Sequence, residues 1–315
     1  MNTMNGRSIA ISIAAGVAAA LLTLSALSFS IGGILLSSLA QLPLFLVGLS
    51  IGVHSAAIAA ASSVAIASIL IRFEFGVFFG LIVAVPAIIL VRQTLLTRES
   101  ADGKTTLWYP PAGLLLVALG LTIAVAMTAL PTAVWPEADQ LTRARNVLVN
   151  LPSEFLPADM TPEAIDRMVR LSLSFLPGFL GIGFFVLLIV NAALAQFILV
   201  RTNRNLRPTP QLQDLALPSW FATGAAVAGI GALFPGMAGI IGGNLVLICA
   251  VGFVFAGLAV VHAMVRAWQA RVPALIALYG ALFLIAPTII VIAMLGIVEP
   301  WARLRERFAG PAPSL

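Results

Sequence analysis

The sequence predicts an all-α integral membrane protein, a polytopic bundle of eight or nine transmembrane helices with a short amphipathic surface segment. Of the 315 residues, 61% are hydrophobic and only 9% are charged, whereas about a quarter of the residues in a soluble domain are charged. Several long stretches contain no charged residue, and the longest runs for 64 residues from Ser8 to Ile71. Because a membrane-spanning helix needs about 20 apolar residues, these stretches leave no room for a separate soluble domain.

The uncharged N-terminal stretch is long enough for three spans. Gly32-Gly33 and Gly52-Val53-His54 are the expected turns between them, because glycine tolerates the backbone angles that turns require. The first span resembles a signal peptide, since Arg7 precedes an apolar run that ends in small residues. We expect it to be an uncleaved transmembrane helix, because the uncharged stretch continues well beyond the length of a signal sequence.

A fourth span over residues 75–91 contains Pro86, and a polar loop follows over 92–106. The fifth span, 107–134, begins with Trp108-Tyr109-Pro110-Pro111. Tryptophan and tyrosine favour the headgroup region of a bilayer, and proline is tolerated in the first turn of a helix, where its missing N–H costs nothing. These signals indicate that the fifth span begins at the membrane interface.

Residues 137–170 are the predicted amphipathic segment outside the membrane. Its first half has apolar residues that recur at spacings of three and four, which is typical of an amphipathic helix: Leu141, Ala144, Leu148 and Leu151. Thr161 and Pro162 are typical of the N-cap and first position of a second helix. We expect both helices to lie along the membrane surface with their apolar faces inward.

The remaining uncharged stretches predict four more spans. Residues 171–200 form the sixth, and 215–265 is long enough for the seventh and eighth, with a break at Phe234-Pro235-Gly236. Residues 273–298 form the ninth, which Pro287 interrupts.

We therefore predict one integral membrane domain over residues 1–298 and an interfacial or disordered tail over 299–315. With a cytoplasmic N-terminus, nine of the 17 basic residues fall on the cytoplasmic side and eight outside, so the count alone sets no orientation. Nine full spans would place the three arginines of the tail on the outer side, where basic residues are less common, so they argue against nine spans. If the last segment re-enters the membrane at Pro287, or one early segment is not a true span, eight spans remain.

Four short motifs carry a resemblance to a known family. In sequence order they are Leu42–Leu49, Trp108–Gly113, Leu217–Trp220 and Gly257–His262. In order and spacing they resemble the YybS-like bacterial membrane proteins, most closely the proteobacterial branch, over nearly the whole chain. The resemblance implies a multi-pass protein of the bacterial inner membrane, in a family catalogued as a domain of unknown function. It implies no substrate, catalytic residue or cofactor.

Candidate functional residues are few, because ionisable groups inside spans are expensive and usually functional, and the predicted spans contain almost none. Asn191 in the sixth span and Asn244 in the eighth would line a small polar ligand site if those spans pack together. Alternatively, each amide only makes a hydrogen bond that holds two helices together. His262 is either a proton-relay group, since its pKa is near neutral, or a residue at the cytoplasmic interface.

Several function classes are excluded or disfavoured. A single cysteine, Cys249, excludes an intrachain disulfide, and two distant histidines disfavour a metal site. The sequence contains no recognisable catalytic motif, so we predict neither enzymatic activity nor a cofactor. The net charge of +5 is accounted for by basic loops that orient membrane helices, so nucleic acid is not a predicted partner.

Two functions remain open. Helices broken by proline predict transport or binding of a neutral or apolar small molecule: the residues are Pro43, Pro86, Pro177, Pro235 and Pro287. The alternative is a non-catalytic scaffold or partner subunit in membrane or envelope assembly. Besides the lipid bilayer, a membrane protein partner is predicted at a stripe of small residues on the first helix, Ala10, Ala14 and Ala18. A similar stripe is the docking surface of the vitamin-binding components of energy-coupling-factor transporters.

Overall fold

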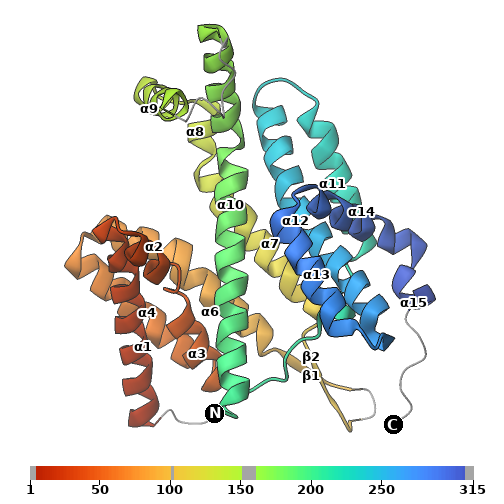
Figure 1. Ribbon diagram of the computed structural model, residues 1–315. Helices are drawn as coiled ribbons and strands as arrows, with labels where there is room; N and C mark the ends of the chain where they lie inside the picture. Colours follow the sequence, from red (N-terminus) through yellow and green to blue (C-terminus); the bar gives the residue numbers. More distant parts are fainter. Residues whose placement is uncertain (1–4, 101–102, 151–160, 309–315) are drawn as a thin grey trace. The chain divides into compact units, whose positions relative to one another are not determined.

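The computed structural model describes residues 5–100, 103–150 and 161–308. They are almost entirely helical, with one antiparallel hairpin of two short strands, β1 (Thr97–Glu99) and β2 (Thr106–Trp108) (Figure 1). Seven described helices are long and apolar enough to cross a membrane, or up to eight if one bent pair is a single span. The all-α, polytopic fold class is confirmed.

The chain divides into two compact units. Unit 1 comprises Met1–Leu121 and Phe185–Asp214, and unit 2 comprises Thr122–Phe184 and Leu215–Leu315. Two helices contribute to both units, α7 (Pro111–Thr128) and α10 (Pro162–Arg201). The sequence shows no change of composition at these boundaries, and the single membrane domain over residues 1–298 stays a prediction.

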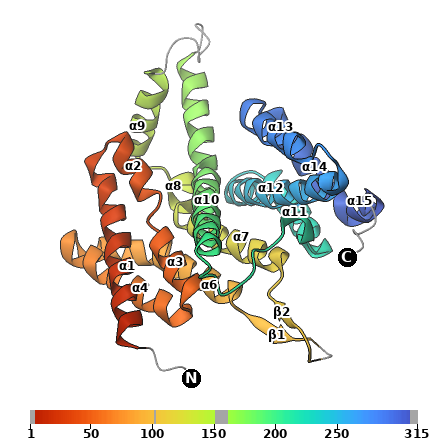
Figure 2. The same ribbon diagram turned by 60° about the horizontal axis from the view of Figure 1, so that its bottom comes forward.

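Unit 1 begins with helices whose apolar residues pack around small ones. In order they are α1 (Gly6–Leu24), α2 (Ile31–Ser37), α3 (Leu42–Ser50) and α4 (Val53–Leu70). Helices α1 and α4 lie side by side (Figures 1 and 2). A side chain at Gly16 of α1 would overlap the carbonyl of Ala59 and the hydroxyl of Ser62 in α4. Glycine is therefore required for this close approach of the two helices.

One of the two expected turns in this region is confirmed and the other is wrong. Gly52, with φ of 135°, separates α3 from α4 as expected. Gly32-Gly33 lies inside α2, and the turn occurs earlier, where Phe29 adopts φ of 49°. The physical reason is the cap: the Ser30 hydroxyl accepts a hydrogen bond from the Gly33 amide at 3.0 Å and starts the helix there.

The fourth span is irregular in the middle. It consists of α5 (Phe73–Phe79), a π-helical segment η2 (Gly80–Ala84) and α6 (Val85–Thr94). Pro86 is the second residue after η2, and a proline has no N–H to donate and displaces the carbonyl four residues before it. Insertion of a π turn is a known way for a helix to accommodate such a disruption.

Unit 2 contains the amphipathic segment. After α8 (Leu130–Val134), helix α9 (Ala138–Val149) turns Leu141, Ala144 and Leu148 toward the protein, while the residues between them are exposed. This confirms the predicted amphipathic helix, whereas its position on the membrane surface stays a prediction; Leu151 lies outside the described residues. An ion pair at 3.2 Å between Arg145 and Asp166 joins α9 to the start of α10.

The predicted second surface helix is not separate from the sixth span. The hydroxyl of Thr161 accepts a hydrogen bond from the Ala164 amide, and Pro162 opens α10, as expected. From there α10 continues for 40 residues to Arg201, a length of about 60 Å at 1.5 Å per residue. Arg167 and Arg170 lie within this helix and do not separate a surface helix from the span.

The rest of unit 2 is a group of adjacent helices. They are α11 (Ser219–Ala232), α12 (Met237–Met264), α13 (Arg271–Leu284) and α14 (Pro287–Ala302), and α11, α12 and α14 lie side by side (Figure 2). The break predicted at residues 234–236 is confirmed, with Gly236 at φ of 72°. Helix α11 has only 14 residues, too few for a full span, so the described residues give seven or eight candidate spans rather than nine.

The last hydrophobic segment is bent where proline predicted an interruption. Helices α13 and α14 meet at an angle of 117°, with Pro287 at the first position of α14. The pair is either a broken span or a re-entrant loop. The predicted boundary between domain and tail, at residues 298 and 299, falls inside α14, and a short helix α15 (Leu304–Phe308) follows.

Candidate functional site

Asn244 makes the most elaborate buried polar contact of unit 2. It lies on α12, its side chain is fully buried, and both ends of its amide bind the backbone of α10. Asn244 Oδ1 accepts a hydrogen bond from the Gly178 amide at 2.6 Å, and Nδ2 donates to the Ser174 carbonyl at 2.8 Å. Nδ2 also donates to Ile240 at 2.7 Å, within α12. Both the donor and the acceptor of the side chain are therefore used.

The backbone groups that Asn244 binds are a matched pair. In a regular α-helix, the amide of residue 178 donates to the carbonyl of residue 174. Pro177 stands between them and disturbs this turn, because it has no N–H and its ring crowds the preceding turn. The amide of Asn244 thus bridges the two groups at a proline-disturbed turn. A β-carbon at Gly178 would come to 2.8 Å from Asn244 Oδ1, so the bridge also requires glycine there.

Asn191 holds a comparable position in unit 1. It is 1% exposed, and its Nδ2 donates at 2.8 Å both to the Ser38 carbonyl, after α2, and to Leu187 in its own helix. Gln41, three residues beyond Ser38, donates to the carbonyl of Val83 in η2 at 3.4 Å. The remaining amide oxygens, Asn191 Oδ1 and Gln41 Oε1, are buried and have no partner among the described residues.

The structure gives the two predicted amide residues separate partners. Asn191 belongs to unit 1 and Asn244 to unit 2, and within the described ranges no hydrogen bond joins them. Each amide binds the backbone of another segment, which agrees with the interpretation as interhelical hydrogen bonds. A shared ligand site at these two residues stays a prediction.

His262, the third predicted site residue, contacts Tyr279 across α12 and α13. Its Nδ1 lies 2.9 Å from the Leu258 carbonyl, and its Nε2 lies 3.4 Å from the Tyr279 hydroxyl. Because a carbonyl oxygen can only accept, Nδ1 is the donor in that bond. A role as proton relay or as interface residue stays a prediction.

Arg207 is a buried residue that the sequence did not single out. It is only 4% exposed, and it follows α10 in unit 1. Its Nη1 donates to the Thr94 carbonyl at 2.9 Å, and its Nη2 donates to the Tyr109 carbonyl at 2.8 Å. The guanidinium carbon lies 5.7 Å from the centre of the Trp108 ring, within the range of a cation–π contact. These contacts tie the end of α6 to the end of β2.

The charge of Arg207 has no carboxylate partner among the described residues. Thr94 is the last residue of α6, where the helix dipole is negative and favours a cation. Burial lowers the pKa of the Arg207 guanidinium from its ordinary value. The Nε atom is buried without a hydrogen-bond partner. Arg207 therefore supplies positive charge that only neutral groups and a helix end offset.

A pocket of about 420 Å³ lies beside Trp108 and Tyr109, the residues that Arg207 contacts. It is lined by residues 96–98 and 107–110, which belong to the hairpin and its flanks. Leucine, tryptophan, tyrosine and proline residues make most of its wall, and Arg98 is the one charged residue among them. The pocket therefore combines an apolar wall with a basic group.

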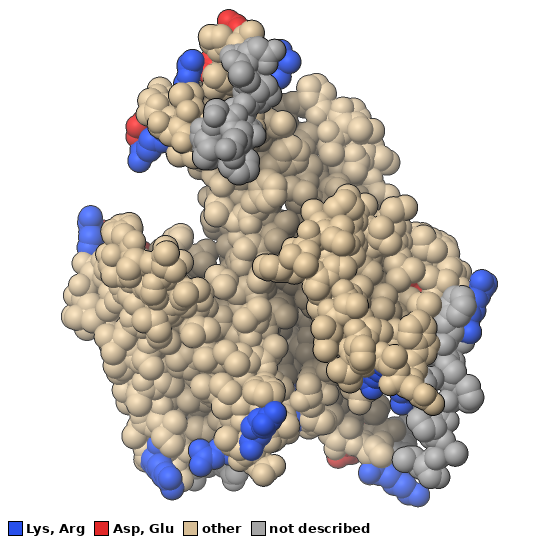
Figure 3. Space-filling model, in the orientation of Figure 1, with Lys and Arg blue, Asp and Glu red and all other residues tan. Residues whose placement is uncertain are grey.

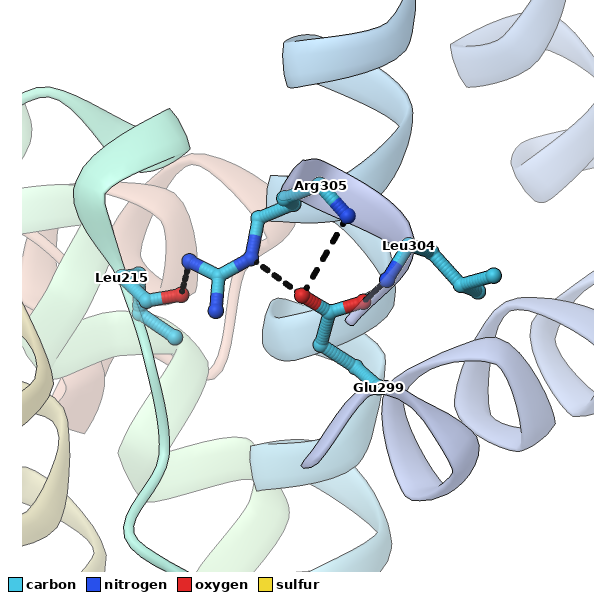
Figure 4. Close-up of polar contacts among 4 residues, drawn as sticks. All are labelled: Leu215, Glu299, Leu304 and Arg305. Atoms are coloured by element: carbon cyan, nitrogen blue, oxygen red, sulfur yellow. Dashed lines mark hydrogen bonds and ion pairs between the residues drawn. The ribbon is translucent and has the colours of Figure 1, made fainter. Parts of the chain in front are cut away.

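A second set of contacts that the sequence did not indicate holds the last described residues in place (Figure 4). Glu299, 6% exposed at the end of α14, accepts hydrogen bonds from the Leu304 amide at 2.9 Å and from Arg305 Nε at 2.7 Å. Arg305 Nη1 donates to the Leu215 carbonyl, before α11, at 2.7 Å. Within unit 2, a carboxylate and a guanidinium thus join residues 299–308 to the segment before α11.

Replacing Glu299 by glutamine should release this end. Glutamine keeps the size but loses the charge that orients Arg305, and hydrogen bonds to charged groups contribute about 1.5–3 kcal/mol. We expect tryptic cleavage after Arg305 to become about tenfold faster, because local opening governs access. Mass spectrometry of the released peptide measures the rate, with Glu163→Gln on α10 as the control. An unchanged cleavage rate would mean that the carboxylate does not hold this segment.

Together these features define a class: a polytopic α-helical membrane protein whose buried polar side chains bind mainly the backbone of neighbouring segments. Most of the surface in the space-filling view has no acidic or basic side chain (Figure 3). The chain belongs to the family described as "Predicted membrane protein (DUF2232)", whose model matches residues 17–299. Comparisons with curated proteins and with solved structures gave no match.

Proposed function

We propose that this protein transports or binds a neutral or apolar small molecule within the membrane and catalyses no reaction. We also propose that it acts in the bacterial inner membrane, as a YybS-like protein of the proteobacterial branch, in agreement with its four sequence motifs. The observation that carries the proposal is the interruption of two apolar segments at proline, by the π-helical segment before Pro86 and by the 117° bend before Pro287. Discontinuous helices present backbone donors and acceptors to substrates in many transporters.

Two further features support the same function. Pro177 lies inside α10, and the backbone groups of Gly178 and Ser174 beside it bind the amide of Asn244 from α12. Glu299, a buried carboxylate of the bent pair, is already neutralised by Arg305. A substrate without net charge fits a membrane interior in which the described acidic groups are paired or lie near helix ends.

The test is to identify what co-purifies with the protein. The protein is isolated in mild detergent and then denatured, and the released compounds are measured by mass spectrometry. An unrelated membrane protein purified in the same way is the reference. We expect one uncharged compound to be enriched, and we expect Asn244→Leu to retain less of it than Gly183→Ala, whose added methyl group meets no neighbour. If no compound is enriched, the proposal is wrong.

The alternative, a non-catalytic scaffold or partner subunit, is favoured by one observation. Ala10 and Ala14 are exposed and Ala18 is half-buried, because α1 packs on α4 through a different face that includes Gly16 and Ala20. The predicted docking stripe is therefore left to lipid or to a partner. Under this alternative, a stoichiometric membrane protein should co-purify, and Ala14→Leu should remove it.

A further inference from the structure

One end of unit 1 is rich in exposed arginines. Five exposed arginines lie there. They are Arg7 in the first turn of α1, Arg92 in the last turn of α6, Arg98 in β1, Arg201 in the last turn of α10 and Arg204 in the loop after α10. These element ends lie in the lower part of the unit in Figure 1, where basic side chains are also seen in Figure 3. Glu99 is the carboxylate described in the hairpin.

The pocket at residues 96–98 and 107–110 lies at this end, and its chemistry is amphipathic. Trp108 and Tyr109 are residues that favour the headgroup level of a bilayer. Leu96 and Leu107 are exposed, although they are apolar. A free inorganic anion would gain nothing from these apolar walls, whereas the region between a lipid headgroup and its acyl chains would match both.

Arg207 fixes the geometry of this pocket and adds to its charge. It binds the carbonyl of Tyr109, a wall residue, and stacks against Trp108, another wall residue. The amide of Tyr109 also donates to the Leu96 carbonyl at 3.0 Å. Arg207 is thus a positioning residue behind the wall. Its charge, partly desolvated and without a carboxylate partner in the described ranges, raises the local positive potential, because charges act more strongly where water is excluded.

We propose that the pocket at the hairpin binds the phosphate-bearing headgroup of an anionic membrane lipid, with Arg98 as its direct cationic contact. The acyl chains would then leave along the apolar wall toward the adjacent spans. This site does not depend on the proposed transport function, because it lies in unit 1 and takes a charged headgroup rather than a neutral solute. Basic residues near a membrane surface each contribute about 1 kcal/mol to anionic lipid binding, a factor of about five.

The test measures lipid-dependent stabilisation of the full chain in neutral detergent. Thermal unfolding is followed while phosphatidylglycerol, phosphatidylcholine or inorganic phosphate is added. We expect phosphatidylglycerol to raise the midpoint, and we expect Arg98→Gln to weaken this lipid's apparent affinity about fivefold. The matched control is Arg167→Gln, an exposed arginine on the unit 2 part of α10, which should leave the affinity unchanged.

Three results would overturn the proposal. Equal stabilisation by phosphatidylcholine would show that no anionic group is recognised. An equal effect of inorganic phosphate would show a free anion site rather than a headgroup site. An equal loss in Arg98→Gln and Arg167→Gln would show general attraction to a basic protein. Arg207→Lys is a second variant: it keeps the charge but cannot hold both carbonyls in the same way, and it should reduce the preference for phosphatidylglycerol.

Discussion

Replacing Asn244 by leucine is expected to lower the free energy of unfolding by about 2–3 kcal/mol, because the change leaves buried backbone groups of α10 without their side-chain partner. The Gly178 amide and the Ser174 carbonyl are the groups affected. Leucine matches asparagine in length and suits an apolar interior, so the loss measures the bridge rather than a cavity. Unfolding by denaturant in mixed micelles, followed by circular dichroism, measures the change.

A second substitution shows whether the bridge compensates for proline. In Pro177→Ala, residue 177 regains an N–H, and the ring that crowds the turn is removed. We expect the double variant Asn244→Leu/Pro177→Ala to recover at least half of the stability lost in Asn244→Leu, because the α10 turn can then close on its own bonds. Strictly additive effects would show that the two residues act independently, and the interpretation of Asn244 as a proline-compensating bridge would be wrong.

The second large effect is expected at the crossing of α12 and α14. A β-carbon at Gly257 would overlap the Ile292 carbonyl, and one at Gly296 would overlap the Phe253 carbonyl. Two backbones in such close contact cannot separate without losing the packing that drives helix association in membranes. We expect Gly257→Val to cost about 3 kcal/mol, at the upper end of overpacking effects, with Gly296→Ala only slightly milder.

Matched glycines elsewhere provide the control. Gly183 on α10 and Gly280 on α13 are helical, and an added β-carbon meets nothing within 4 Å at either position. Alanine there should be neutral or stabilising by up to about 1 kcal/mol, because glycine loses more conformational freedom on folding. If Gly257→Val and Gly183→Ala gave the same unfolding midpoint, close helix contact would not explain the glycine at 257.

The elements that the sequence predicts well are those set by local patterns. Charge-free stretches predict apolar helices, the spacing of Leu141, Ala144 and Leu148 predicts α9, and Thr161-Pro162 predicts the start of α10. Where a local rule failed, tertiary context was the reason. The predicted surface segment ends at residue 170, after Arg167 and Arg170, but α10 runs through it into the sixth span and places both arginines at exposed positions before its apolar part.

The candidate sites were harder to predict, because their partners are distant in sequence. Asn191 and Asn244 stood out as amides in apolar stretches, yet their partners, the backbone at Ser38 and at Gly178, carry no recognisable signal. Arg207 looked like one basic loop residue among several, and Glu299 like the first residue of a tail. A sequence signal for Glu299 existed in retrospect: an acidic residue one turn before Arg303 and Arg305, with Pro300 between them.

The preference of these buried side chains for backbone partners has a consequence for how the protein tolerates change. Asn191, Asn244 and Arg207 bind main-chain groups of Ser38, Ser174 and Thr94, and every residue type presents the same carbonyl. Replacing the residue whose side chain makes the contact removes the hydrogen bond. Many replacements of the residue that contributes only its carbonyl preserve it. Each contact therefore constrains one position and leaves its partner free to vary, so paired changes between relatives would not reveal it.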